Sequence, residues 1–213
     1  MRSSVLLVAG LVAGTLFAAD KPEKGFVSLF NGKDLTGWTA AKENPESFSV
    51  KDGAIVANGK YCHLYYSGPF KGKEPDFKNF ELKVDVMTRA KSNGGIYFHT
   101  TYQDKGWPDK GFEVQVNNSH GDWKKTGGLY NVQDNKEPFK DDEWFTEHII
   151  VKDKHVQVFV NDKKVSDWTQ PDDWQGPKGS PGRVLGAGKT FALQAHDPGS
   201  TIYYKNIRVK PLK

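Results

Sequence analysis

The sequence has few of the features that stabilise or anchor many exported proteins. Its 213 residues include one cysteine, Cys62, so no disulfide can form within the chain. There are 30 Lys and Arg against 26 Asp and Glu, which is far from the clustered basic charge of a nucleic-acid-binding surface. After residue 21 no segment keeps the three- and four-residue apolar spacing of an amphipathic helix. The sequence therefore excludes a disulfide scaffold, predicts little helix, and argues against a nucleic-acid partner.

A long hydrophobic run is also missing. The apolar stretch from Val5 to Phe17 is shorter than the ~20 residues that a membrane-spanning helix needs. It follows the positive start Met1-Arg2 and precedes the small residues Ala18-Ala19, which is the order typical of a secretory signal. We predict a signal peptide over residues 1–19 and an exported protein, periplasmic or extracellular, that is not inserted in the membrane once the signal is removed. The alternative is an uncleaved N-terminal anchor.

The rest of the chain contains many short segments of alternating apolar and polar residues, separated by Gly, Asn, Asp and Pro. This pattern predicts an all-β sandwich. A length of about 190 residues suits one all-β domain, so residues 20–213 are predicted to form a single domain. The strands that we expect are 80–86, 95–99, 112–117, 191–196 and 202–209, together with a hairpin made by 148–152 and 155–160.

Two connections are unusually long. One spans 100–110 and the other 167–189. Loops of this length are uncommon in compact domains and are often functional.

Three of the expected strands carry reactive side chains between their apolar residues. Because successive strand residues point to opposite faces, these side chains should all lie on faces turned away from the core. They include acids, bases, amides and an aromatic, whereas a merely solvated face more often carries Lys, Glu and Thr. The alternative is that this face simply meets water. The residues are Tyr97, His99, Glu113, Gln115, Gln194 and His196.

Several segments resemble the 3-keto-disaccharide hydrolase domain family in their order and spacing, from about residue 25 to residue 209. They are GFVSLFNGKDLTGW at 25–38, SNGGIYF at 92–98, GFEVQV at 111–116, TGGLY at 126–130, Trp144, LQAH at 193–196 and KNIRV at 205–209. The resemblance implies a concanavalin A-like jelly-roll sandwich with a sugar site on its concave face. It also implies action on a 3-keto-glucoside or disaccharide, which a separate oxidoreductase would have to supply.

The implied chemistry is an elimination followed by hydration. A ketone at C3 acidifies the hydrogen at C2, so a base can remove it and the enolate can expel the C1 substituent. Addition of water would make the net reaction a hydrolysis. Such a site needs a base, an acid for the leaving oxygen and a group that holds the enolate oxygen. We expect Glu113 and His196 to be the proton-transfer pair.

The other residues are candidates for binding. Tyr97, His99, Gln115 and Gln194 could hold sugar hydroxyls or the ketone. Trp107 and Trp123 could stack on a sugar ring, although each could instead pack its loop onto the sandwich. The chain departs from the family at His99, where relatives often have Arg, and along 117–123.

The sequence does not identify a cofactor for this chemistry. A divalent ion could nevertheless steady an enolate, and His99, Glu113, His196 and Asp197 are of ligand type, although no compact motif such as HExxH is present.

Three other functions fit parts of the sequence. A retaining glycosidase needs two carboxylates roughly 5 Å apart, but the neighbours of Glu113 on its strand face are Gln115 and Asn117. A non-catalytic carbohydrate-binding module would need aromatic stacking and amides without an acid–base pair. A structural adhesion domain would need no reactive cleft.

Overall fold

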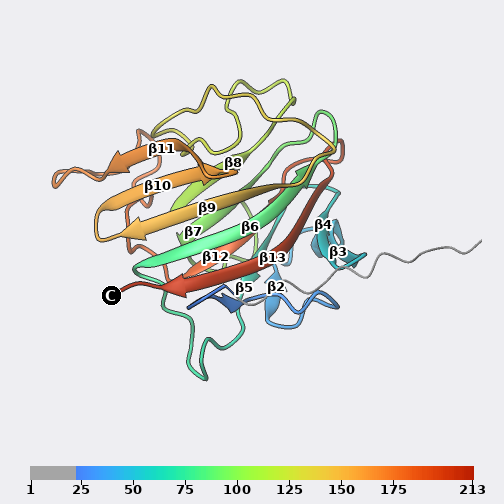
Figure 1. The fold of residues 1–213 in the computed structure, drawn as a ribbon, viewed down its shortest axis with the longest axis horizontal. Helices are drawn as coiled ribbons and strands as arrows, with labels where there is room; N and C mark the ends of the chain where they lie inside the picture. Colours follow the sequence, from blue (N-terminus) through green and yellow to red (C-terminus); the bar gives the residue numbers. More distant parts are fainter. Residues whose placement is uncertain (1–22) are drawn as a thin grey trace, which may run out of the picture.

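The computed structural model describes residues 23–213, and the predicted signal peptide lies outside the described residues. Two antiparallel β-sheets pack face to face (Figure 1). The only helical element in residues 23–213 is a short 3₁₀ turn, Pro45–Ser47. None of the described helices has the length and apolar character needed to cross a bilayer. The predicted all-β, two-sheet jelly-roll sandwich is therefore confirmed.

The larger sheet has eight strands in the order β11-β10-β9-β6-β13-β4-β3, with β1 paired to β13. The smaller sheet has five strands in the order β2-β5-β12-β7-β8. The strand bounds are β1 Val27–Ser28, β2 Trp38–Ala40, β3 Phe48–Lys51, β4 Ala54–Ala57, β5 Cys62–Tyr66, β6 Phe80–Thr88, β7 Gly94–Thr100, β8 Phe112–Val116, β9 Phe145–Lys152, β10 His155–Val160, β11 Lys163–Thr169, β12 Thr190–Ala195 and β13 Ile202–Pro211.

The core forms where the apolar faces of the two sheets meet. In β6 the residues Phe80, Leu82, Val84 and Val86 are fully buried, while the residues between them are only partly buried. This is the alternation expected of a strand with one face on the core. From the smaller sheet, the ring of Phe191 packs edge-on against Phe80, with 4.9 Å between the ring centroids. The opposite face of the smaller sheet is left for the long loops to cover.

Every strand predicted from alternation is present. The hairpin of β9 and β10 turns at residues 153–154, as expected, and β11 follows the turn at Asn161-Asp162. The short strands β1 to β5 were not predicted.

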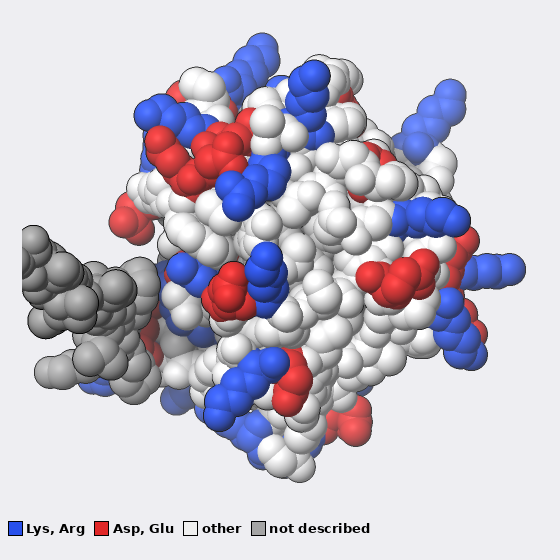
Figure 2. Space-filling model, turned by 90° about the vertical axis from the view of Figure 1, so that its right-hand side faces the viewer, with Lys and Arg blue, Asp and Glu red and all other residues white. Residues whose placement is uncertain are grey.

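Charge is mixed on the surface. On the face seen in Figure 2, Lys and Arg side chains are interspersed with Asp and Glu around a largely uncharged central area. The described residues on that face therefore form no one-signed patch of the kind that nucleic-acid binding uses.

Candidate active site

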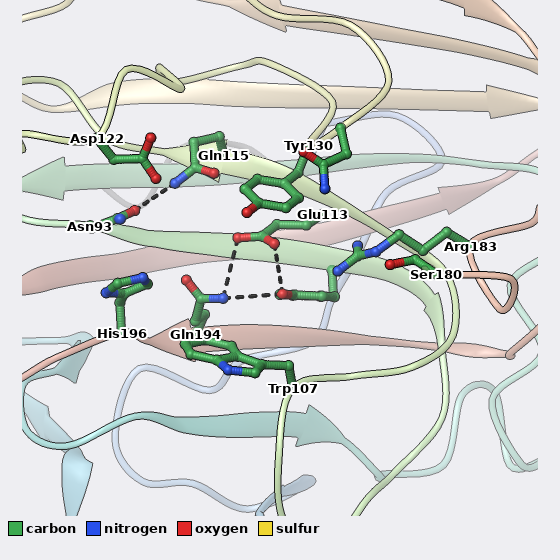
Figure 3. A pocket seen from close by; sticks show the side chains of 12 residues that line it. Asn93, Trp107, Glu113, Gln115, Asp122, Tyr130, Ser180, Arg183, Gln194 and His196 are labelled. Carbon is green, nitrogen blue, oxygen red and sulfur yellow. Dashed lines mark hydrogen bonds between the residues drawn. The ribbon is translucent and has the colours of Figure 1, made fainter. Parts of the chain in front are cut away.

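A pocket opens on the face of the five-stranded sheet that points away from the core. Its volume is about 320 Å³, near the lower end of the range for small-molecule sites. Strands β7, β8 and β12 form its floor, and the loops after β7, β8 and β11 form its walls (Figure 3). The lining residues are Asn93, Tyr97, Trp107, Glu113, Gln115, Asp122, Tyr130, Asn131, Ser180, Arg183, Gln194 and His196.

Glu113 lies at the centre of the pocket floor and is held by its neighbours. The Tyr97 hydroxyl donates to Glu113 Oε2 at 2.7 Å, and the Gln194 amide donates to Glu113 Oε1 at 3.2 Å (Figure 3). Gln194 Nε2 also lies 3.1 Å from the Tyr97 oxygen. Gly95, on the neighbouring strand, provides the room, because a Cβ there would lie 2.5 Å from Glu113 Oε1. The carboxylate is therefore fixed in one position.

The surroundings of Glu113 tune its proton affinity. Burial raises the pKa of Glu113, while the hydrogen bond from Tyr97 and the positive charge of Arg183 partly oppose the rise. Burial also raises the pKa of Tyr97 well above its ordinary value, and the nearby Glu113 carboxylate adds to this. Tyr97 therefore stays a hydrogen-bond donor, and Glu113 is a carboxylate with increased basicity. A carboxylate of this kind is suited to proton transfer.

Two amide side chains are oriented by their partners. Gln194 Nε2 faces Glu113 and Tyr97, and it also lies 3.5 Å from His63 Nε2. The pKa of His63 is lowered to about 3, first by burial and then by the charges of His196 and Arg183. His63 is therefore neutral and can accept a hydrogen bond from Gln194.

Gln115 is oriented in a similar way. Its Nε2 donates to Asn93 Oδ1 at 2.5 Å and to the Gly94 carbonyl at 3.2 Å. The carbonyl oxygens of Gln115 and Gln194 are both buried without a partner in the described chain. A buried acceptor without a partner is costly, so each of these oxygens is suited to accept a hydrogen bond from a ligand hydroxyl.

His196 directly follows β12 and forms a dyad with Asp197. The distance from His196 Nδ1 to Asp197 Oδ2 is 2.8 Å. Asp197 also accepts hydrogen bonds from Ser200 Oγ at 2.9 Å and from the Gly199 amide at 2.8 Å. Burial alone would raise the pKa of Asp197, but the hydrogen bonds from His196 and Ser200 outweigh it and lower the pKa. An ionised Asp197 accepts a hydrogen bond from Nδ1–H of His196, which leaves Nε2 free to exchange protons.

Arg183 was not predicted from the sequence, and it supplies the positive charge of the pocket. It lies on the long connection between β11 and β12 and is 7% exposed. Its guanidinium lies 5.9 Å from the ring centroid of Tyr97 and 5.6 Å from that of Tyr130. Its Nη1 is buried without a hydrogen-bond partner among residues 23–213. A donor of this kind is suited to an oxygen that gains negative charge during a reaction.

The pocket brings together six of the eight residues that strand alternation and loop position predicted. These are Tyr97, Trp107, Glu113, Gln115, Gln194 and His196. Two others, His99 and Trp123, do not line it.

His99 points away from the pocket because the strand is bulged at this residue. The pairing of β12 with β7 shifts register between Thr190 and Phe191, and His99 has a φ of 52°. A bulge with a left-handed residue redirects the side chain, so His99 does not share a face with Tyr97. Its ring instead lies against Phe80, with 5.7 Å between the ring centroids.

The two loop tryptophans have different surroundings. Trp107 stacks one face on Tyr61, with ring centroids 5.2 Å apart and an angle of 24° between the planes, and it lines the pocket. Trp123 is 65% exposed. The ammonium of Lys124 lies 4.2 Å from the Trp123 ring centroid and 5.0 Å from that of Tyr130, and of these two rings only that of Tyr130 lines the pocket.

Residues that the sequence reasoning missed come mainly from loops. They are Asn93, Asp122, Tyr130, Asn131, Ser180 and Arg183. Two signals pointed to some of them: the length of the connection that carries Ser180 and Arg183, and the motifs at 92–98 and 126–130, which contain Asn93 and Tyr130.

The ligand-type residues named from the sequence do not form a metal cluster. In residues 23–213, no group of three or more His, Cys, Asp or Glu side chains is arranged to hold an ion. Cys62, on β5 of the pocket sheet, is buried, and burial raises its pKa to about 11.

Comparison with known proteins places this geometry in context. The model of the 3-keto-alpha-glucoside-1,2-lyase-like domain matches residues 25–210. A 3-keto-disaccharide hydrolase of Bacteroides thetaiotaomicron is 25% identical, over 88% of this chain and 79% of that protein. A crystal structure from Parabacteroides distasonis, provisionally named a glycosyl hydrolase, is 26% identical with a TM-score of 0.73, over 89% of this chain and 94% of the other. A carbohydrate-binding module from Bacillus subtilis is 12% identical with a TM-score of 0.56, over 82% and 95% of the two chains, and it shows the shared fold alone.

Proposed function

The chain belongs to the 3-keto-alpha-glucoside-1,2-lyase-like domain family, and on this premise we propose that it is an exported enzyme that cleaves 3-keto-glycosides by elimination and hydration. One observation carries the proposal. A buried carboxylate of raised pKa, Glu113, shares one pocket with a histidine–aspartate dyad and an arginine whose Nη1 has no partner among the described residues. These are the base, the acid and the oxyanion-holding group that the reaction needs.

The first step is removal of the C2 proton. Glu113 takes this proton, and the electrons of the C–H bond form the C2–C3 double bond of an enolate. The negative charge moves to the C3 oxygen, where the guanidinium of Arg183 stabilises it. Tyr97 and Gln194 hold the carboxylate in position through their hydrogen bonds to its two oxygens.

The second step breaks the bond to the leaving group. The enolate electrons form a C1–C2 double bond and expel the C1 oxygen, which receives a proton from Nε2 of His196 in its imidazolium form. Water then adds to C1 and gives a proton back to His196 Nε2, while Glu113 returns its proton to C2, so the net reaction is a hydrolysis. The buried carbonyl oxygens of Gln115 and Gln194 accept hydrogen bonds from ring hydroxyls, and the exposed part of the Trp107 ring supports the sugar ring.

The substrate of this reaction is a glycoside that already carries a ketone at C3. A separate oxidoreductase would have to form that ketone.

The test is incubation of the purified protein with 3-keto-trehalose and 3-keto-glucosides, with the unoxidised glycosides as controls. Release of the leaving group is followed by chromatography, with and without chelator. We expect release only from the keto substrates, and a fall of about 10²- to 10⁴-fold in Glu113→Gln and His196→Ala. Glu143→Gln, at an exposed glutamate, is the matched control and should keep full activity.

The same experiment decides against the proposal when no keto substrate is cleaved. Retained sugar binding without cleavage would identify a carbohydrate-binding module instead. Loss of release in the presence of chelator would show that a divalent ion takes part.

A further inference from the structure

His99 makes two hydrogen bonds that fix its protonation. The Gly186 amide donates to His99 Nδ1 at 3.0 Å, and His99 Nε2 lies 2.9 Å from the Lys78 carbonyl oxygen. An amide N–H can only donate and a carbonyl can only accept. His99 is therefore the neutral tautomer with its proton on Nε2. Burial lowers the pKa of His99, although the backbone carbonyl of Lys78 partly opposes this, and the lowered pKa favours that neutral form.

The packing of the ring is equally defined. Its centroid lies 5.7 Å from that of Phe80 and 5.5 Å from that of Phe98, and the residue is 2% exposed. The side chain thus fills a space between the core and the loop that follows β11. Its two nitrogens join that loop to the segment before β6.

Gly186, whose amide is bound by His99, lies close to Arg183 along the chain. On one side of Arg183, the Gly182 carbonyl accepts a hydrogen bond from the Gly111 amide at 3.2 Å. On the other side, Gly186 is bound to the His99 imidazole. Gly182 is pressed so closely onto the neighbouring loop that a Cβ there would lie 2.0 Å from the Asp109 carbonyl oxygen. Arg183 is therefore placed between two anchored glycines.

We propose that His99 is a positioning residue, which holds the Arg183 guanidinium in the pocket by anchoring its loop at Gly186. The proposal rests on the proposed function only for its effect on catalysis. Without the Gly186 hydrogen bond the segment after Arg183 loses its attachment to β7, and only contacts such as that of the Leu185 amide with Gln170 Oε1 remain on that side. The guanidinium is then less well fixed over the site where the enolate oxygen forms.

The test uses two substitutions at His99 that differ in hydrogen bonding. Phenylalanine keeps the ring contacts with Phe80 and Phe98 but removes both hydrogen bonds. Glutamine offers an acceptor for the Gly186 amide and a donor for the Lys78 carbonyl. We expect His99→Phe to lower kcat/KM about five- to tenfold, mainly through kcat, and His99→Gln to stay within about threefold of the unmodified protein.

A double-mutant cycle shows whether the effect passes through Arg183. In an Arg183→Ala background, His99→Phe should change kcat/KM less than twofold, because the group that it positions is gone. Lys178→Ala, at an exposed position of the same loop, is the control for general loop effects. An equal loss in both backgrounds would overturn the proposal.

Two measurements without substrate separate this proposal from the proposed function. Nitrogen chemical shifts should show His99 protonated on Nε2 alone, and amide exchange of residues 182–188 should be faster in His99→Phe but not in His99→Gln. Exchange that is unchanged in His99→Phe would refute the anchor even in an active enzyme. Faster exchange in a protein that cleaves no keto-glycoside would support the anchor and reject the proposed reaction.

Discussion

Gly95 offers a sharp test of how the pocket is built. It lies on β7 within the pocket sheet, paired with Gln115. A Cβ added there would lie 2.5 Å from Oε1, 2.7 Å from Cγ and 3.0 Å from Cδ of Glu113. All three close atoms belong to one side chain. Gly95 does not have a positive φ, so alanine can adopt its backbone conformation. The substitution Gly95→Ala therefore acts on Glu113 and leaves the strand in place.

The size of the effect follows from these distances. Carbon atoms in favourable contact lie about 3.5–4.0 Å apart, so Glu113 must move by about 1 Å. That displacement breaks the hydrogen bond from Tyr97, which is 2.7 Å long. A misplacement of about 1 Å in a reacting group costs on the order of 100-fold in rate. Overpacking of this kind also lowers the free energy of unfolding by about 1–3 kcal/mol.

The assay compares kcat/KM on a 3-keto-glucoside with the urea midpoint of unfolding. Gly121→Ala is the matched control, because a Cβ at Gly121 has no atom within 4 Å and its φ is not positive. We expect a fall of about 100-fold for Gly95→Ala in a folded protein and no change for Gly121→Ala. Activity of Gly95→Ala within twofold of the unmodified protein would refute the assigned position and role of Glu113.

Three further predictions concern other parts of the molecule. Asp197→Asn should lower kcat at least tenfold with little change in KM, because a neutral amide cannot stabilise the imidazolium from which His196 Nε2 donates its proton. Ser200→Ala, which removes one hydrogen bond to Asp197, should have a smaller effect, and equal effects would count against the dyad. Glu147 is fully buried, and burial raises its pKa well above 4.5. Above about pH 4.5 the folded protein therefore holds a proton that the unfolded chain has lost, so the free energy of unfolding falls as pH rises, by up to about 1.4 kcal/mol per pH unit. Glu147→Leu should remove this slope, so the gain in free energy of unfolding of the variant over the unmodified protein, measured in urea, should grow from pH 5 to pH 8; a gain that stays constant would contradict the assignment. Trp107→Ala should raise KM about tenfold with a smaller change in kcat, since it removes a stacking surface. Trp123→Ala should leave KM and kcat within twofold of the unmodified protein, and a larger rise of KM in Trp123→Ala than in Trp107→Ala would show that Trp123 binds the sugar.

The sequence predicted the pocket floor because strand alternation is a physical constraint. In an unbroken strand, Glu113 and Gln115 must share a face, and Gln194 on β12 follows the same rule. The rule depends on regular pairing, and it failed at His99, where a bulge breaks the register. No sequence pattern marked that bulge, because the left-handed conformation falls on a histidine and not on a glycine.

The pocket walls could not be predicted in the same way. Arg183 and Tyr130 lie on loops, where no period relates a residue's position to its direction. Their placement depends on particular contacts, such as the hydrogen bond from Trp174 Nε1 to the Arg183 carbonyl at 2.8 Å. The early strands β1 to β5 were missed for a related reason, since runs of two to five residues are too short to show alternation clearly.

The surroundings of Cys62 give the chain a practical advantage for spectroscopy. The thiol is 1% exposed and its pKa is raised to about 11, so at neutral pH it is neither accessible nor ionised, and thiol reagents react with the thiolate. A cysteine introduced by Lys178→Cys, on the exposed part of the loop that carries Arg183, would therefore be the only residue that takes up a maleimide dye. Movements of that loop during turnover could then be followed by fluorescence without first replacing the native cysteine.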